Sequence, residues 1–221
     1  GDVIASYENF PYDTRGMVWV EDKLYVIDYD YLLLKQYSIS AAELTLEGSY
    51  GLFTTSYGIT WDGEYLWIGD YSGGEIRAYN LDGTYTGTYF ISPVYDENAL
   101  TYDGEYFIVH DWNYNNPTIY RIDYTGAIIE SFSSSINNVD AYQSVWVTDH
   151  DDGHLWVTTY SGTIAQLSLE SGIAEIVQEF STPSHYDGYS LTHDGTDLWF
   201  HGQEYTLYQI DDGIIELDYL Q

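Results

Sequence analysis

The stretch YGITWDGEYLWIGDYSGGEIRAYNLDGTYTGTYF, residues 57 to 90, reads as one complete structural unit. Short runs of aromatic and β-branched residues alternate with Gly, Asp and Ser clusters at roughly the 8–12-residue spacing of strands joined by turns. No segment offers a convincing helical period. The stretch therefore predicts four short β-strands in succession.

The same pattern returns along the chain. A copy that begins NALTYDGEYFIVHD starts at Asn98, others start at Ser144 and Tyr189, and a more divergent one starts at Gly16. In the quoted copy, Asp62-Gly63 predicts a two-residue hairpin turn after the first strand. The equivalent steps in the other copies are Glu21-Asp22, Asp103-Gly104, Asp152-Gly153 and Asp194-Gly195.

Five copies of a four-stranded antiparallel unit, one roughly every 40 to 50 residues, predict an all-β fold and a five-bladed β-propeller. Apolar residues on both faces of the second strand, as at Leu66, Trp67 and Ile68, indicate a sheet covered on both sides. A β-sandwich and an open solenoid are the alternatives. We expect a single domain over residues 1–221. Its blades are placed at about 16–56, 57–97, 98–143, 144–188 and 189–221, after an N-terminal strand in 1–15.

The phrases GITWDGEYLWIGD and IRAYNLDG, with their partners ALTYDGEYFIVHD and IYRIDYTG, resemble the blades of NHL-like propellers and of the five-bladed plant-type glutaminyl cyclotransferases. The resemblance covers essentially the whole chain. It rests on turn and packing motifs, so it implies a fold rather than an activity. A cyclotransferase-like enzyme that uses channel carboxylates is one implied alternative, but the resemblance assigns no catalytic residue.

The charge of the chain is extreme. The sequence has 36 Asp and Glu against 5 Lys and Arg, a formal net charge of -31, and no cysteine. Such a surface repels phosphate backbones and anionic lipids, so we expect neither nucleic-acid binding nor membrane insertion. Salt, divalent cations or mild acid relieve the repulsion. These conditions predict an extracellular or cell-surface protein, with halophile cytoplasm as the alternative.

Aromatic and polar residues recur in the loops that a propeller places around one mouth of its channel. The loop before each first strand and the loop between the second and third strands share that face, where aromatic rings beside carboxylates and amides suit sugars. The candidate ligand-binding residues are Tyr29, Tyr71, Trp112, Tyr160, Tyr57, Asn98, Gln143 and Tyr189. Alternatively, these residues only end strands and cover sheet edges.

An acidic turn and the histidines are the candidates for a metal site or for catalysis. Asp149, Asp151 and Asp152 crowd one turn and suggest calcium, the one candidate cofactor, although a solvated acidic turn is the alternative. His110 and His201 occupy equivalent positions in second strands, and His193 is expected to be packed in the interior. No catalytic motif occurs in the sequence, so no catalytic residue is assigned.

The chain has one strand more than its blades need, since both residues 2–10 and residues 214–221 read as the outer strand of the last blade. One of them could complete that blade, both could lie side by side in it, or the spare one could pair with the edge of another molecule. The last option builds filaments, because the contact is head-to-tail. The sequence therefore predicts a non-enzymatic extracellular structural or adhesive subunit that binds copies of itself. A propeller that binds glycan or protein is the alternative.

Overall fold

The protein is described by a computed structural model, which covers residues 1–40, 43–70, 73–94, 99–111, 117–134, 143–150, 153–159, 162–184 and 188–213. These residues form an all-β fold, and no helical segment of membrane-spanning length and hydropathy occurs among them. The strands are β1 (Val3–Glu8), β2 (Thr14–Val20), β3 (Lys23–Asp28), β4 (Leu33–Ser40), β5 (Glu43–Gly51), β6 (Ser56–Trp61), β7 (Leu66–Asp70), β8 (Glu75–Tyr79), β9 (Tyr85–Ile91), β10 (Leu100–Tyr102), β11 (Phe107–Asp111), β12 (Thr118–Ile122), β13 (Ile128–Ser134), β14 (Ser144–Trp146), β15 (Leu155–Thr158), β16 (Thr163–Glu170), β17 (Ile173–Ser181), β18 (Gly188–His193), β19 (Leu198–Gly202) and β20 (Thr206–Ile210).

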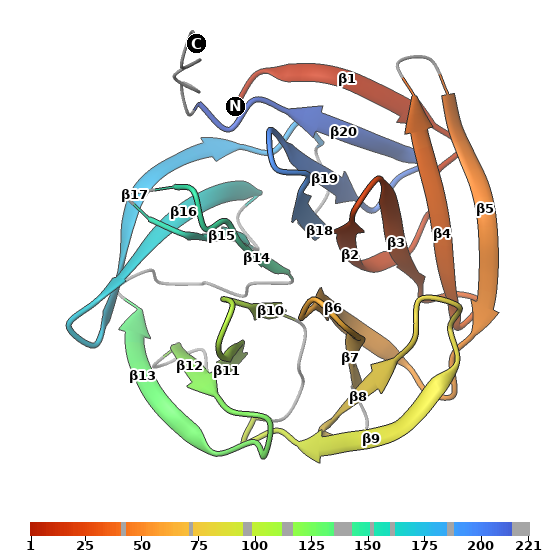
Figure 1. Ribbon diagram of the computed structural model, residues 1–221. Coiled ribbons are helices and arrows are strands. Elements are labelled where there is room, and N and C mark those ends of the chain that lie inside the picture. Colours follow the sequence, from red (N-terminus) through yellow and green to blue (C-terminus); the bar gives the residue numbers. More distant parts are fainter. Residues whose placement is uncertain are drawn as a thin grey trace, which may run out of the picture.

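The strands are arranged around a central axis (Figure 1). We call their antiparallel runs group 1 (β2–β5), group 2 (β6–β9), group 3 (β10–β13), group 4 (β14–β17) and group 5 (β18, β19, β20 and β1). The first strand of each group lies nearest the axis. Each inner strand contacts the inner strand of the next group, and β18 contacts β2, so the ring is closed. The predicted propeller-like ring is thereby confirmed.

Groups 3 and 4 join into one eight-stranded sheet at their outer edges. Ser133 and Ser134 of β13 pair in parallel with Ile173 and Ala174 of β17. The backbone N–H of Ser133 also donates to the carbonyl of Gly172, at 2.9 Å, at the tip of the β16–β17 hairpin. The junction is short, and its reach comes from the length of that hairpin.

The hydrophobic core is divided among the contacts between neighbouring groups. Each adjacent pair shares one buried cluster, including groups 5 and 1, where Trp199 and Leu207 pack with Met17 and Leu24. All five residues of β7 are buried. The predicted covering of second strands on both faces is therefore correct, and it explains their nearly continuous apolar sequence.

The N-terminal strand completes group 5. β1 pairs antiparallel with β20, with Tyr7 opposite Leu207 and Val3 opposite Ile210. The alternative in which residues 2–10 are the spare strand is therefore wrong: β1 satisfies the row of N–H and C=O groups that the edge of β20 presents. Residues 214–221, the other candidate for the outer strand of the last blade, lie outside the described residues.

The described Asp-Gly steps form two-residue hairpin turns one residue later than predicted: the backbone N–H of Asp62 donates to the carbonyl of Tyr65 at 3.3 Å, which leaves Gly63 and Glu64 as the loop. The Glu21-Asp22 step forms the predicted turn, since Val20 pairs with Lys23. One carboxylate oxygen of Asp62 accepts the backbone N–H groups of Glu64 and Tyr65, and the other accepts the indole N–H of Trp67 at 2.7 Å. The left-handed φ of 100° at position 63 requires glycine there. The aspartate therefore ties the turn to the second strand.

Candidate binding sites at the axis and on the loop face

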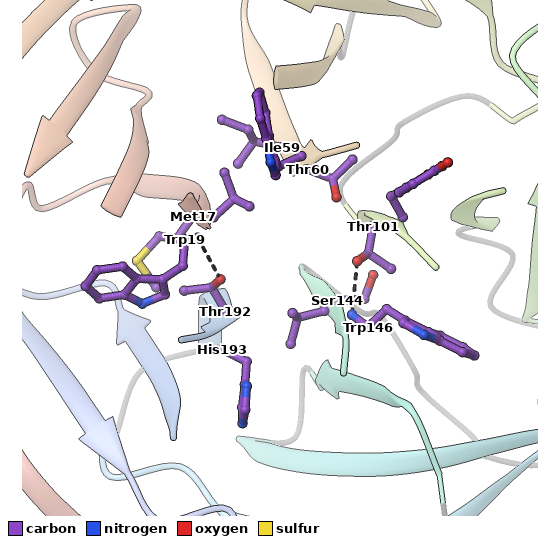
Figure 2. Close-up of a pocket in the computed structure, with 13 residues that line it drawn as sticks. Met17, Trp19, Ile59, Thr60, Thr101, Ser144, Trp146, Thr192 and His193 are labelled. Atoms are coloured by element: carbon purple, nitrogen blue, oxygen red, sulfur yellow. Dashed lines mark hydrogen bonds between the residues drawn. The ribbon is translucent and has the colours of Figure 1, made fainter. Parts of the chain in front are cut away.

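A cavity of about 140 Å³ lies on the axis of the ring. Figure 2 shows that Trp19 and Trp146 point away from its middle, while smaller side chains surround it. Its lining residues come from the inner strands of all groups: Met17, Val18, Trp19, Ile59, Thr60, Trp61, Thr101, Tyr102, Ser144, Val145, Trp146, Thr192 and His193. No Asp, Glu, Lys or Arg occurs among these described lining residues, so the cavity is polar but nearly uncharged.

Threonine hydroxyls at equivalent positions hold the inner strands together. Thr101 Oγ1 accepts the backbone N–H of Trp146 at 3.0 Å, and Thr192 Oγ1 accepts that of Trp19 at 3.3 Å (Figure 2). Because each oxygen already accepts an N–H, its own hydroxyl hydrogen is left to donate. The two threonines thus join neighbouring groups and also offer donors at the axis.

Two further polar groups at the axis lack hydrogen-bond partners among the described residues. Ser144 Oγ is buried at 2% exposure, and Gln143 Oε1 is buried on a residue with 0% exposure. Gln143 Nε2 donates across the axis to the carbonyl of Ile59, at 3.5 Å. Buried polar atoms are normally paired, so these atoms mark a place for water or a ligand.

A buried cluster of two histidines and one aspartate lies beside the cavity. Asp212 Oδ2 is 3.1 Å from Nε2 of His150 in group 4 and 3.1 Å from Nε2 of His193 in group 5. The three side chains are at most 5% exposed. Gln178 also donates to the backbone carbonyl of Asp212. We call these three residues the His–Asp–His cluster; they join the end of β20 to two groups.

The His–Asp–His cluster has the spacing of a metal site but the wrong hydrogen bonds. Nδ1 of His150 accepts the indole N–H of Trp156 at 2.8 Å, and Nδ1 of His193 accepts the backbone N–H of Gly195 at 3.0 Å. Each neutral imidazole must therefore carry its proton on Nε2 and donate it to Asp212. A metal ligand needs that nitrogen unprotonated, with Nδ1 as the donor. The residues do not fit a metal ion.

The loops that were predicted to share one face do so where the structure describes them. Residues 9–13, 29–32, 52–55 and 203–205, which we call the loop face, are linked by backbone hydrogen bonds from Phe10 to Tyr205, Tyr29 to Asp13, and Leu52 to Leu32. These bonds place the loops before two first strands next to loops between second and third strands. The loop face is thus continuous across groups 5, 1 and 2.

Two of the predicted ligand-binding residues meet beside the loop face. The rings of Tyr29 and Tyr57 are 5.3 Å apart, and the guanidinium of Arg15 lies 5.0 and 5.2 Å from their centroids. Asp13 binds the same guanidinium, with Arg15 Nε 2.6 Å from Oδ1. Burial raises the pKa of Asp13, Arg15 opposes the shift, and the nearby carboxylates of Asp30 and Asp28 add to it. These tyrosine rings already hold a cation.

The other predicted residues divide into two sets. Gln143 lies at the axis, toward which its loop was expected to bring it, and it is fully buried there. Tyr71, Trp112, Tyr160 and Asn98, together with the side chain of Tyr189, lie outside the described residues. Of the predicted calcium residues, Asp149 is exposed, while Asp151 and Asp152 lie outside the described part, so calcium binding stays a prediction.

Sequence reasoning missed the axial cavity and the His–Asp–His cluster. The threonine signal was available, since Thr60, Thr101 and Thr192 occupy the same position in three copies. The cluster had no such signal because Asp212 follows the last complete strand and is remote from His150 in sequence. His193 is buried as expected, but it also forms this hydrogen-bonded cluster.

Comparisons with known proteins support the fold alone. No family model matches the chain, and no curated protein matches it at the significance required. The chain is similar to the solved structure of Myxococcus xanthus glutaminyl cyclase, at 12% identity and a TM-score of 0.73 over 94% of each chain. It is also similar to the WD40 β-propeller domain of Doa1, at 14% identity and a TM-score of 0.60 over 95% of this chain and 96% of the other. A further similarity is to a virginiamycin B lyase from Staphylococcus aureus, at 16% identity and a TM-score of 0.53 over 89% of this chain and 65% of that one. The predicted resemblance to propellers of the cyclotransferase and NHL-like kind is confirmed at the level of the fold.

Proposed function

We propose that the chain is a five-bladed β-propeller, each group being one blade, and that it works as a non-enzymatic binding module. Its ligand is a small uncharged polar ring, such as one sugar unit, held in the axial cavity. The observation that carries this proposal is a cavity lined by threonine hydroxyls and by Ser144, whose buried hydroxyl has no partner among the described residues, with no Asp, Glu, Lys or Arg in the described lining. Its volume resembles that of cavities of about 150 Å³ that accept benzene.

The lining of the cavity favours binding over acid–base catalysis. Transfer of a proton requires a titratable group whose reactive atom reaches the ligand. His193 is the imidazole among the described lining residues, and both of its ring nitrogens are engaged, by Asp212 and by the N–H of Gly195. The cyclotransferase-like alternative lacks support here, because similarity at 12% identity extends only to the fold.

The test uses Ser144→Ala, because the Ser144 hydroxyl has no partner in the described protein and its loss leaves no other group unpaired. We would screen monosaccharides by ligand-observed NMR and measure any binding by calorimetry. Removing one hydrogen bond to a neutral ligand is expected to weaken binding about three- to tenfold. Ser6→Ala, on exposed β1, is the matched control and should bind normally.

Two results would contradict the proposal. One is that no neutral sugar or polyol binds at millimolar concentration, which would leave the cavity to ordered water. The other is that a sugar binds equally well to the wild type and to Ser144→Leu, whose side chain would occupy the cavity. Unchanged melting temperatures for the variants would show that their fold is intact.

Strand-donating self-assembly, the first choice from the sequence, now has less support. Its N-terminal version is excluded because β1 pairs with β20 of the same chain. A version that uses residues 214–221 stays a prediction, to be tested by deleting those residues and measuring particle size by light scattering. An unchanged size would contradict it.

An extracellular or cell-surface setting is part of the proposal. All five Lys and Arg residues are in ion pairs with carboxylates: Arg15, Lys23, Lys35, Arg77 and Arg121. The remaining negative charge therefore has no basic side chain to offset it. A medium rich in salt or divalent cations supplies that compensation. Recovery of the untagged protein from cytoplasm alone would contradict this setting.

A further inference from the structure

The loop face carries large aromatic side chains that are exposed in the described protein. Phe53 is 74% exposed, Tyr31 73%, Tyr205 62% and Tyr12 39%. Tyr12 and Tyr205 come from opposite sides of the β1–β20 seam, and their ring centroids are 5.1 Å apart. Neighbouring exposed aromatic rings on one face indicate an interaction surface rather than scattered apolar residues.

Carboxylates without basic partners accompany these rings. Asp30, beside Tyr31, is exposed and belongs to none of the described ion pairs. Glu204 precedes Tyr205 and is half-buried; its side chain is hydrogen-bonded to Tyr208 and belongs to none of the described ion pairs. A carboxylate without a basic partner next to an exposed aromatic pair favours a donor that carries positive charge.

We propose that the loop face docks an arginine-bearing peptide segment of a basic partner protein, with one guanidinium on the Tyr12–Tyr205 rings beside Glu204. This surface is separate from the axial cavity, so the inference goes beyond the proposed function. Charge complementarity selects the partner, because a chain of net charge -31 attracts basic proteins over long distances.

The chain itself contains the same arrangement at a neighbouring position. Arg15 lies against the rings of Tyr29 and Tyr57 while Asp13 binds its guanidinium. Lys35 likewise has its Nζ 5.9 Å from the ring centroid of Tyr31 and pairs with Asp28. The Tyr12–Tyr205 pair with Glu204 has the rings and the carboxylate, and a partner would supply the cation.

The probe is a capped peptide of alternating glycine and arginine, and the control peptide has citrulline in place of arginine. Citrulline keeps the shape of the side chain but removes its charge. We would measure binding to the full chain by calorimetry at two salt concentrations. The arginine peptide should bind at least tenfold more tightly than the citrulline peptide, and added salt should weaken it.

The deciding comparison uses variants of equal net charge. Tyr205→Leu removes one ring and should weaken binding of the arginine peptide about three- to tenfold. Tyr89→Leu, in outer strand β9 with 52% exposure, is the matched control and should have no effect. Glu204→Gln should weaken binding to a similar extent, and it tests the carboxylate separately.

Equal affinities of Tyr205→Leu, Tyr89→Leu and the wild type would show diffuse attraction to an acidic surface and would overturn the proposal. Equal binding of the arginine and citrulline peptides would also overturn it, because the face would then recognise no charge. Displacement of the peptide by a neutral oligosaccharide, without any effect of Glu204→Gln, would assign the face to sugars instead. Circular dichroism melting of each variant confirms that the fold is retained.

Discussion

Two pairs of buried histidines show how differently one residue type can be used in this ring. His110 in β11 and His201 in β19 are buried, and each has one ring nitrogen without a hydrogen-bond partner among the described residues. His150 and His193 have both ring nitrogens engaged and share Asp212. Burial is common to both pairs, so the hydrogen-bond partners make the difference. The first pair fills space, and the second joins groups 4 and 5 to the end of β20.

The largest expected effect is that of acid on the first pair. Burial lowers the pKa of His110 to about 4 and that of His201 to about 4, from an ordinary value of 6.5. As the pH falls, these histidines take up protons in the unfolded chain before they do so in the folded chain. Their contribution to stability is therefore fully present above pH 6.5 and is lost as the pH falls from 6.5 to about 4. The loss is about 3 kcal/mol for each histidine.

Urea unfolding of the wild type and of His110→Leu between pH 7 and pH 4 measures this effect. The variant should lose less stability, by about the contribution of one histidine. The effect opposes the expectation from composition that mild acid stabilises the chain by neutralising carboxylates. A free energy of unfolding that rises steadily from pH 7 to pH 4.5 would show that carboxylate repulsion outweighs the two histidines.

The second pair is tested by removing its shared acceptor. Asp212→Ala leaves the Nε2–H groups of His150 and His193 buried without a partner, which should destabilise the protein by about 3 kcal/mol. Asp149→Ala, next to His150 but exposed, is the control and should change little. Chemical denaturation at pH 7 measures both variants. Equal stability of the two variants would mean that the cluster does not hold the groups together.

Removing Asp62, which accepts an indole N–H as His150 does, should destabilise the protein less than removing Asp212. Trp67 donates to Asp62 in group 2, whereas Trp156 donates to His150, which contacts Asp212 in turn. Asp62→Ala removes four hydrogen bonds, one of them from the hydroxyl of Tyr124 in group 3 at 3.2 Å, but all four are exposed or only partly buried, so we expect a loss of about 2 kcal/mol. Asp82→Ala, whose carboxylate accepts one backbone N–H in an exposed turn, should lose less. A larger loss of unfolding free energy for Asp62→Ala than for Asp212→Ala would contradict the expected order.

Salt should hardly change the stability difference between Asp212→Ala and the wild type. It should raise the melting temperature of both. Sodium chloride screens repulsion among exposed carboxylates, so the melting temperature should rise from low salt to molar salt. Screening hardly reaches buried hydrogen bonds, so the stability difference between Asp212→Ala and the wild type should stay constant. A melting temperature that falls steadily with salt would contradict the role given to surface charge.

The sequence predicted the ring because each copy of the repeat has apolar residues at the same positions and buries them in the same way. Leu66 and Leu198 recur at matching positions and are both fully buried, since each group covers both faces of its second strand. The turn geometry was predicted less well, because Asp62 acts through its side chain and a two-residue rule considers only the backbone. The His–Asp–His cluster could not be predicted, because Asp212 and His193 of the fifth copy meet His150 of the fourth, and the other copies have no equivalent residues.

The candidate sites follow the same distinction. The contact of Tyr29 with Tyr57 follows from aligning the copies, and the structure has it. The exposed Tyr12–Tyr205 pair lies where β1 returns to β20, so it depends on how the ring closes. Gln143 was expected near the axis, but its hydrogen bond to the carbonyl of Ile59 was not predicted, because only the assembled ring brings β6 within reach of its amide.

The pairing of β1 with β20 also has a consequence for biosynthesis. β1 leaves the ribosome long before its partner exists, and at about 5–20 residues per second the roughly 200 residues between them take about 10 to 40 s. During that time Val3 and Ile4 belong to a strand that has nothing to pair with, and group 1 has no neighbour on one side. We therefore expect closure of the ring to be the last step in its folding, and newly made chains to be most vulnerable to mispairing just before β20 is synthesised.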